Sequence, residues 1–184
     1  MNKKEILSDV LRHVDVTVDE ARAYLKQSTA MRRAAGEETE SPDVSADDGE
    51  EIAAPEAALS PERYAELGAQ EQFVLTVSEG GFGKRSSAYE YRVIGRGGSG
   101  IVAMAMAKKN AKISASFPVE DTDQLMLITD GGQTIRVPVS QIRVAGRATQ
   151  GVILFRLGEG ERVVSVERIG EAAGEIEGEA EAPK

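Results

Sequence analysis

The sequence predicts a mainly β chain with a propeller-like repeat, in which about two antiparallel sheets of four to five strands lie side by side. The first observation is a duplication, because residues 92–101 reappear as residues 143–152, at a spacing of 143 − 92 = 51. The second is a set of positions that recur at that spacing: Gly80, Gly81 and Arg85 become Gly131, Gly132 and Arg136. A period near fifty residues with short strand-like runs is typical of small sheets that need neighbours to bury their faces.

The N-terminal region, residues 1–35, is expected to hold a weak strand at 5–16 and a helix that begins at Val18. Thr17 and Glu20 have the spacing of a capping box, and Gly36 is expected to end the helix. The helix is expected to be peripheral because its apolar stripe is narrow and consists of Val18, Ala21 and Leu25.

Two helical or unstructured segments are expected before the repeats. Residues 36–57 contain nine acidic side chains, no basic ones and almost no large apolar ones, so they are expected to form a disordered acidic linker. Residues 58–71 are expected to hold a short helix, because Ser60 and Pro61 are typical of a helix start, and Gly68 is expected to end it.

The repeats are expected at residues 72–122 and 123–169, and an acidic disordered tail at residues 170–184. Alternating β-branched and apolar residues between turn signals predict the strands. In the first repeat these are 73–77, 83–93, 101–106 and 112–117; in the second they are 124–129, 133–139, 142–144, 151–157 and 162–169. Pro138 interrupts a β run, which predicts an edge strand or a bulge there.

The net charge of −9 conceals two kinds of region. The repeats, residues 72–169, carry thirteen Lys and Arg against nine Asp and Glu, which is 13 − 9 = +4. The tail from Gly170 carries five glutamates against Lys184. The chain is therefore a basic module between acidic flanks, and its average charge does not exclude a polyanionic partner.

Composition also excludes several classes of chemistry. The chain has no cysteine, so disulfides, thiolate metal sites and cysteine nucleophiles are excluded, and a reducing compartment is expected. His13 is the sole histidine and is interpreted as a structural or surface residue rather than a ligand or base. No stretch resembles a signal peptide, and the longest apolar run, 101–107, is far shorter than the roughly 20 residues that span a bilayer. We expect a cytoplasmic protein with no membrane partner.

Several stretches resemble the last blades of the C-terminal domain of bacterial DNA gyrase A. They are Phe-Gly-Lys-Arg-Ser-Ser at 82–87, Glu-Tyr-Arg-Val at 90–93, Arg-Gly-Gly-Ser-Gly at 96–100, and the longer runs 123–136 and 142–152. The resemblance covers residues 72–169, and residues 1–35 look like the end of a preceding blade plus a helix.

This resemblance implies a β-pinwheel whose basic rim wraps double-stranded DNA through its phosphate backbone. The whole enzyme is an ATP-dependent type II topoisomerase, an isomerase that introduces negative supercoils and works with DNA in the nucleoid. The implied protein partners are the rest of gyrase A, together with gyrase B. ATP and Mg would be bound by other parts of that complex, and no cofactor is expected in this chain.

The chain also departs from the family pattern. The wrapping box of the family has the form Gln-x-Arg-Gly-Gly-Lys-Gly, whereas residues 94–100 lack its Gln and its second basic residue. The strand-passage domain is absent, and the four tyrosines lack the Arg-Tyr context of the catalytic one: Tyr24, Tyr64, Tyr89 and Tyr91. We therefore expect a fragment without catalytic activity of its own.

The candidate DNA contacts are basic residues that recur in the two repeats, together with the lysines of one turn. They are Lys84, Arg85, Arg92, Arg96, Lys108, Lys109, Arg136, Arg143 and Arg147. Arginine suits phosphate because its planar guanidinium makes two hydrogen bonds and keeps its charge. If roughly seven cations were engaged, the log–log slope of affinity against salt would be near −6. The alternative is that these residues are simply solvated on a sheet surface.

Other motifs leave further hypotheses open. Residues 95–100 fit Gly-x-Gly-x-x-Gly, but the nucleotide motif needs a helix after it and a strand is expected from Ile101. Glu120, Asp121 and Asp123 suggest a metal or acid–base site, although solvated turn acids explain them better. The acidic tail is either a solubilising end or a competitor of phosphate. As a whole, the repeats could also form a protein-interaction module that docks on a partner chain without binding DNA.

Overall fold

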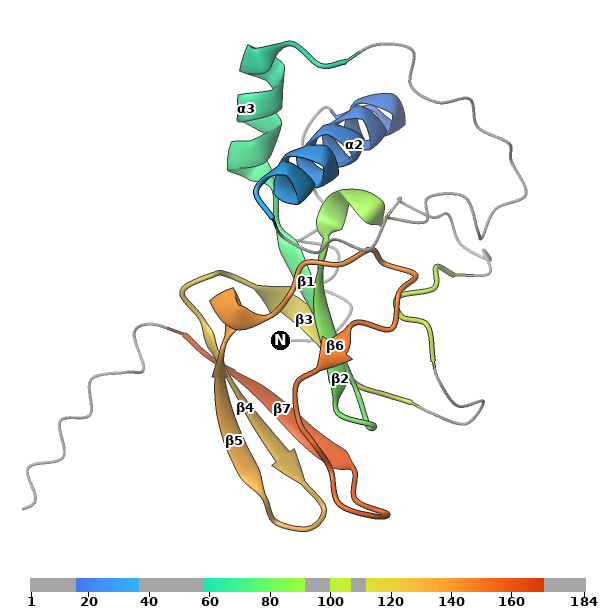
Figure 1. Cartoon of the computed structure of the whole chain (residues 1–184), viewed down its shortest axis with the longest axis vertical. Helices are drawn as coiled ribbons and strands as arrows, with labels where there is room; N and C mark the ends of the chain where they lie inside the picture. Colours follow the sequence, from blue (N-terminus) through green and yellow to red (C-terminus); the bar gives the residue numbers. More distant parts are fainter. Residues whose placement is uncertain (1–15, 37–57, 92–99, 107–111, 171–184) are drawn as a thin grey trace, which may run out of the picture.

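The computed structural model describes residues 16–36, 58–91, 100–106 and 112–170, in which two helices lie over one end of two β-sheets (Figure 1). The helices are α2 (Val18–Ala34) and α3 (Pro61–Gln70), and two short 3-10 turns are η1 (Ala88–Glu90) and η2 (Val139–Gln141). The strands are β1 (Phe73–Ser78), β2 (Phe82–Ser87), β3 (Ile113–Val119), β4 (Gln124–Thr129), β5 (Thr134–Pro138), β6 (Val152–Ile153) and β7 (Val163–Ile169). The prediction of a mainly β chain is confirmed.

The two sheets are built on the same three-stranded plan. The first sheet has the order β3-β1-β2-β6 and the second has the order β5-β4-β7, and all named pairings are antiparallel. The central strands β1 and β4 correspond at the 51-residue spacing, and each has a bulge at the same place, between Val77 and Ser78 or between Ile128 and Thr129. Two corresponding hairpin glycines, Gly81 and Gly132, adopt positive φ values of 78° and 80°, which a side chain would disfavour.

The sheets differ in strand number because the second repeat contributes a strand to the first sheet. β6 belongs to the second repeat by sequence, yet it pairs with β2 of the first sheet. Among the described residues nothing plays that part for the second sheet, which therefore has three strands rather than the expected four to five. β5 lies at an edge, as the proline at 138 predicted.

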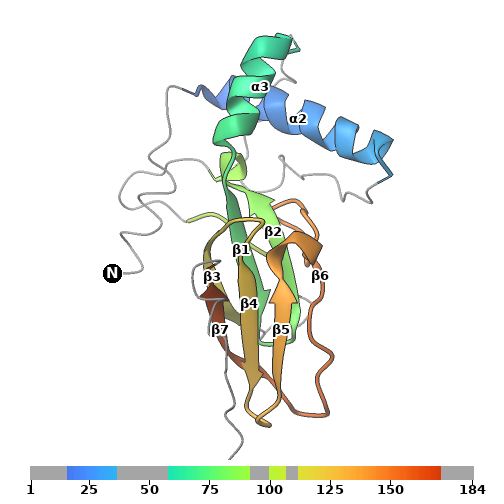
Figure 2. The same cartoon turned by 90° about the vertical axis from the view of Figure 1, so that its left-hand side faces the viewer.

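The core lies between the two sheets, and Figure 2 shows β4 in front of β1. Alternate side chains of both central strands belong to this core. Leu75 and Val77 on β1 and Leu125 and Leu127 on β4 are all 0% exposed. Burying one such side chain contributes roughly 1.5–3 kcal/mol. Neither sheet covers this surface alone, so the two repeats stabilise each other.

Several predicted strands have other structures. After β2 the chain forms η1, where the Ser87 hydroxyl accepts from the Tyr89 N–H, so residues 88–91 do not continue the strand. Residues 101–106 form no strand, and Ala105 N donates to Thr149 O from an irregular segment. Residues 142–144 make one isolated bridge, between Val144 and Arg85. Of residues 151–157 only Val152–Ile153 are strand.

The helices pack against each other and against η1. The predicted capping box of α2 is present, with Glu20 N donating to Thr17 Oγ1 at 3.2 Å and Thr17 N donating to Glu20 at 2.9 Å. Tyr24 stacks on Tyr64 of α3 and meets Tyr89 of η1 edge-on, at centroid distances of 4.9 and 5.4 Å. These rings, together with the fully buried Leu67, fix the helical pair to the first sheet.

The interior face of α2 differs from the predicted stripe, and α3 is longer than expected. Val18 is 58% exposed, whereas Ala23, Tyr24 and Leu25 are buried. α3 continues past Gly68 to Gln70.

Some expectations concern residues outside the described ranges. These are the weak strand before residue 16 with His13, the acidic linker at 37–57 and the tail from residue 171. Within the described ranges, neither helix has the length and hydropathy of a membrane-spanning segment.

Candidate nucleic-acid interface

Lys84 was expected at the surface, but the structure buries it completely. Its side chain lies on β2 and is 0% exposed. The Nζ donates to the backbone oxygens of Gly146, at 2.5 Å, and Arg147. A fully buried ammonium that is bonded to the protein's own carbonyls is not available to phosphate, so the expected contact at Lys84 is wrong.

Arg85 is likewise occupied inside the protein and is only 8% exposed. Its Nε donates to Ile142 O at 2.7 Å, and its Nη1 pairs with the Asp121 carboxylate. The guanidinium also lies over the Phe73 ring, 5.5 Å from the centroid. Arg85 thus connects β2, the segment between the sheets and the end of η2. This structural role replaces the expected phosphate contact.

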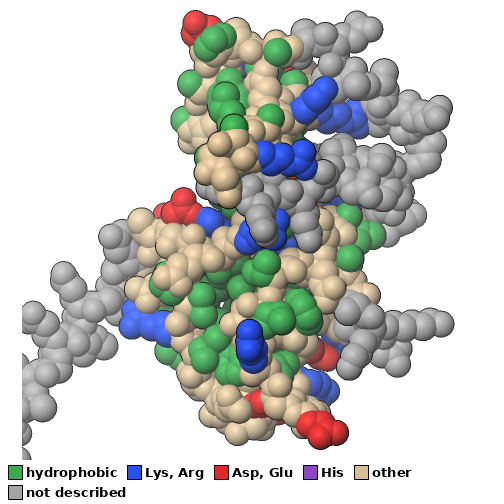
Figure 3. All heavy atoms as spheres, viewed as in Figure 1, with side chains coloured by type: hydrophobic (Ala, Val, Ile, Leu, Met, Phe, Trp, Pro, Cys, Tyr) green, Lys and Arg blue, Asp and Glu red, His purple; other side chains and the backbone are tan. Residues whose placement is uncertain are grey.

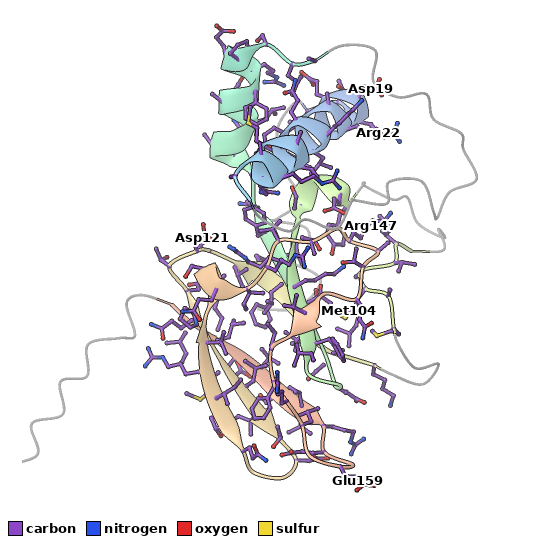
Figure 4. The ribbon with its side chains drawn as sticks, viewed as in Figure 1. Asp19, Arg22, Met104, Asp121, Arg147 and Glu159 are labelled. Atoms are coloured by element: carbon purple, nitrogen blue, oxygen red, sulfur yellow. The ribbon has the colours of Figure 1, made fainter. Side chains whose placement is uncertain are left out.

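Arg147 is also 8% exposed, which contradicts the expectation of a rim position. Its Nη1 donates to Val102 O at 2.8 Å, and its backbone N–H donates to Glu90 Oε2 at 2.5 Å. Figure 4 shows Arg147 where the loop of the second repeat lies between the helices and the sheets. Lys84 and Arg85 are buried because residues 142–153 of the second repeat lie along β2, and Arg147 is part of that segment.

Two predicted contacts remain accessible to different degrees. Arg136 on β5 is exposed, and Arg143 is half-buried beside β2, where its backbone oxygen accepts from Arg85 N. The other four, Arg92, Arg96, Lys108 and Lys109, lie outside the described residues. The structure therefore leaves six of the nine predicted cations as candidates.

The structure also exposes basic residues that the repeat pattern did not select. They are Lys112, Arg156, Arg162 and Arg168. Arg162 Nε lies 3.2 Å from the Asp130 carboxylate. The backbone N–H of Arg162 is the largest cause that lowers the pKa of that carboxyl. Arg168 lies 3.4 Å from Asp123. None of these four residues has a basic counterpart 51 positions earlier, so a search for repeated cations passes over them.

Positive charge is not continuous over the described part of the face shown in Figure 3. On the face shown in Figure 3, the described Lys and Arg side chains are separated by hydrophobic and other atoms. Figure 4 shows Asp121 and Arg147 toward the helical end of the sheets and Glu159 at the opposite end. The distal hairpins carry further acids, among them Asp130 and Glu161, which accept hydrogen bonds from Arg162 and Gln133.

The acidic cluster between the repeats has a structural explanation. Asp123 is buried, and its carboxylate accepts from the Glu120 N–H at 2.8 Å. Asp121 pairs with Arg85, as described above. No group of three potential ligands for a metal ion occurs in the described ranges. Turn formation and ion pairing account for these carboxylates.

The Gly-x-Gly-x-x-Gly stretch lacks the element that a nucleotide site needs. Gly100, its last residue, has φ 85°, and residues 101–106 that follow contain no helix. Without a helix N-terminus there is no dipole end to hold a pyrophosphate. Residues 92–99 themselves lie outside the described ranges.

Comparisons with known proteins agree with this architecture. Residues 72–120 and 123–169 match the family described as the DNA gyrase C-terminal domain, a β-propeller. The chain is 51% identical over 166 residues to DNA gyrase A of Granulibacter bethesdensis, and 42% identical over 174 residues to that of Rickettsia bellii. These alignments cover 88% and 94% of this chain but 18% of each relative, so the chain spans less than a fifth of their length.

A solved structure shows the same fold. The C-terminal domain of DNA topoisomerase IV superimposes with a TM-score of 0.50 at 24% identity. The superposition covers 54% of this chain and 31% of that one. At this identity the likeness concerns the fold alone.

Proposed function

Because the chain belongs to the family of DNA gyrase C-terminal β-propeller domains, we propose that it is a DNA-binding module of DNA gyrase A with no catalytic activity of its own. The observation that carries this proposal is the family match, which extends over both repeats, residues 72–120 and 123–169. In this proposal the module holds bent DNA for the strand-passing parts of a type II topoisomerase, and so contributes to negative supercoiling.

The proposed partners are double-stranded DNA, the rest of gyrase A, and gyrase B. Binding is expected through the phosphate backbone and without sequence preference, in the cytoplasm at the nucleoid. Bending some tens of base pairs costs on the order of 1–6 kcal/mol, so several ionic contacts are needed to offset it. ATP and Mg belong, in this proposal, to other parts of the complex.

The buried cations change the expected salt dependence. Lys84, Arg85 and Arg147 are excluded as phosphate contacts, which leaves six of the nine candidates. Each neutralised phosphate releases about 0.9 counterion, so the log–log slope should be near −5 if all six are engaged, compared with about −8 for all nine. Exposed basic residues that are paired with acids, such as Arg162 with Asp130, should contribute little to this slope.

The test is a titration of the whole chain with duplex DNA of unrelated sequences, followed by fluorescence anisotropy at a series of salt concentrations. We expect similar affinities for all sequences and a slope of about −5. Absence of binding even at low salt would contradict the proposal.

A pair of arginine variants sharpens this test. Arg136→Ala removes an exposed candidate contact and should reduce the size of the slope by about 0.9. Arg162→Ala is the matched control, because that exposed arginine already has Asp130 as a partner, and the slope should stay unchanged. Equal changes in both variants would mean that Arg136 has no particular role.

A second candidate function is a β module that docks on a partner chain without DNA. One observation favours it: Met126 and Ile128, on the outward face of the second sheet, correspond to Leu75 and Val77, which are buried between the sheets. The outward face thus keeps apolar residues at positions that make a sheet-to-sheet contact in the first repeat. Failure of every DNA titration would favour this candidate.

A further inference from the structure

The turn at residues 146–149 of the second repeat is held on the first sheet by a buried lysine. Lys84 Nζ donates to the oxygens of Gly146 and Arg147 and lies 3.5 Å from Thr149 Oγ1. Thr149 in turn donates to Gly146 O, through its N–H at 3.1 Å and its hydroxyl at 2.8 Å. One ammonium therefore organises the carbonyls of a whole turn, and it does so from a different repeat.

Glu90 holds the same turn by the opposite charge. Its carboxylate accepts from the backbone N–H of Arg147 at 2.5 Å, whereas Lys84 binds the backbone oxygen of the same residue. The backbone N–H and the backbone oxygen of Arg147 are thus both bonded to charged side chains of the first repeat. Gly151 follows two residues after the turn, with φ 79°, and an added Cβ there would lie 2.5 Å from Gly83 O, so the backbone approaches β2 closely.

The two charges depend on each other. A fully buried ammonium is costly unless charged or dipolar groups compensate it. Burial, as the largest cause, raises the pKa of the Glu90 carboxyl, whereas the Arg147 N–H and the positive charge of Lys84 oppose that rise and favour the carboxylate. Removing one member of such a pair leaves the other buried and uncompensated. Removing both is far better tolerated.

The second repeat shows that this pair is not needed to form the sheet. At the 51-residue spacing, Lys84 corresponds to Ile135 and Glu90 corresponds to Gln141. In the described part of the second sheet, no segment lies along β5 as residues 143–153 lie along β2. The charged pair thus occurs in the first repeat, where the turn at 146–149 packs on the sheet. Neutral residues replace the pair in the second repeat, where no such turn is seen among the described residues.

We propose that Lys84 and Glu90 are a positioning pair, which holds the turn at 146–149 against the first sheet and so fixes where the neighbouring Arg143 meets DNA. The proposal rests on the proposed DNA-binding function for its last step only. In this role Lys84 acts on DNA through the turn and never touches phosphate, in contrast to the expectation from the sequence.

The chain itself supplies the variants for a test. Lys84→Ile and Glu90→Gln introduce the residues that the second repeat already uses at these positions, and the double variant combines them. Lys112→Ile is the control, because that lysine is exposed just before β3. Backbone amide exchange is measured by NMR on the whole chain without DNA, and DNA affinity is then measured against salt.

We expect Lys84→Ile to accelerate exchange of the Thr149 amide by at least about tenfold, while amides of β4 and β7 stay protected. The double variant should regain global stability over either single variant but keep the fast exchange at Thr149. DNA affinity should fall several-fold in Lys84→Ile, in Glu90→Gln and in the double variant, because Arg143 is no longer held in place. A direct phosphate contact at Lys84 would instead leave the affinity of Glu90→Gln undiminished, since that variant removes no cation. Lys112→Ile should leave the exchange at Thr149 unchanged.

Several outcomes overturn the proposal. Unchanged exchange at Thr149 in the folded double variant would show that the pair does not hold the turn, whether or not DNA binds. A loss of DNA affinity in Lys84→Ile but not in Glu90→Gln would make Lys84 a direct contact. If the unaltered chain binds no DNA, the proposed function fails and the last step of this proposal fails with it, while the exchange data still decide whether the pair holds the turn. Should Lys84→Ile not fold, the milder Glu90→Gln and the double variant give the same answer.

Discussion

Arg85 and Arg136 occupy the same position in the two repeats, yet their side chains have different surroundings. Arg85 is bonded to Ile142 O and Asp121, which come from the segments after the first sheet. Arg136 is exposed on β5. The position is therefore suited to join one repeat to the next, and whether it does so depends on what packs against it.

This difference predicts the stabilities of two matched variants. Arg85→Met should lower the free energy of unfolding by about 1–3 kcal/mol, because it removes internal hydrogen bonds to a buried side chain. Arg136→Met should change it by no more than about 0.5 kcal/mol, as is usual for exposed sites. Urea denaturation followed by circular dichroism measures both.

Similar losses in the two variants would contradict the assignment of Arg85 as a junction residue. A loss confined to Arg136→Met would contradict it more strongly. The Asp121→Asn variant provides a further check, since its partner is Arg85 and its effect should not add to that of Arg85→Met.

The candidate site could be predicted from the sequence only in part. The repeated spacing correctly identified Arg85 and Arg136 as corresponding positions. It could not show that Arg85 is buried, because its partners Asp121 and Ile142 lie 36 and 57 residues away. Lys84 is a similar case, since its acceptors lie 62 and 63 residues away. Burial that arises from such distant segments leaves no local pattern in the sequence.

At the level of elements, prediction succeeded where the signals are local. The capping box at Thr17 and Glu20, and the hairpins of β1–β2 and β4–β5 with their glycine turns, form as expected. Prediction failed at residues 101–106, whose apolar run suggested a strand. There the backbone bonds to the turn of the other repeat, through Ala105 N and Thr149 O, instead of joining a sheet. Tertiary contacts, rather than local propensity, determine the conformation of this segment.

The start of α2 should respond to acid in a defined direction. The Thr17 N–H, followed by the Arg63 side chain, lowers the pKa of Glu20 from 4.5 to about 2. A lowered pKa in the folded state stabilises the protein above the unfolded value, and this contribution is lost as pH falls from about 4.5 through about 2. Glu20→Gln should therefore lower the melting temperature at pH 7, and the difference from the unaltered chain should vanish near pH 2.

Thermal melts followed at 222 nm between pH 7 and pH 2 measure this difference. Glu62→Gln on α3 is a suitable control for the loss of one exposed acid from the helical pair. A difference that persists at pH 2, or one that grows as the pH falls, would contradict the role of the ionised carboxylate in the cap.

In the described part of the chain, the two repeats share one core rather than forming two separate domains. The core between the sheets draws Leu75 and Val77 from one and Leu125 and Leu127 from the other. β6 of the second repeat completes the first sheet. Neither repeat therefore contains all the contacts that its own strands need.

A shortened chain tests this interdependence. Residues 58–122 alone would contain β1, β2 and β3 but neither β6 nor the facing sheet, so we expect no stable fold. Residues 58–170 should fold. Dispersion of the amide resonances in a two-dimensional NMR spectrum distinguishes the two results, and a well-dispersed spectrum from residues 58–122 would contradict the expected interdependence.

The pairing of β6 with β2 also has a consequence for the chain during its synthesis, because it determines when each sheet edge is covered. Within the described ranges β5 lies at a sheet edge, and Pro138 with the charged Arg136 makes that edge a poor template for another chain. β2 has no proline and depends on β6 for cover. While the chain leaves the ribosome, β2 emerges well before β6, so its edge stays open to neighbouring nascent chains until the later residues arrive. Translation that stalls between the repeats should consequently yield an aggregation-prone intermediate that needs a chaperone.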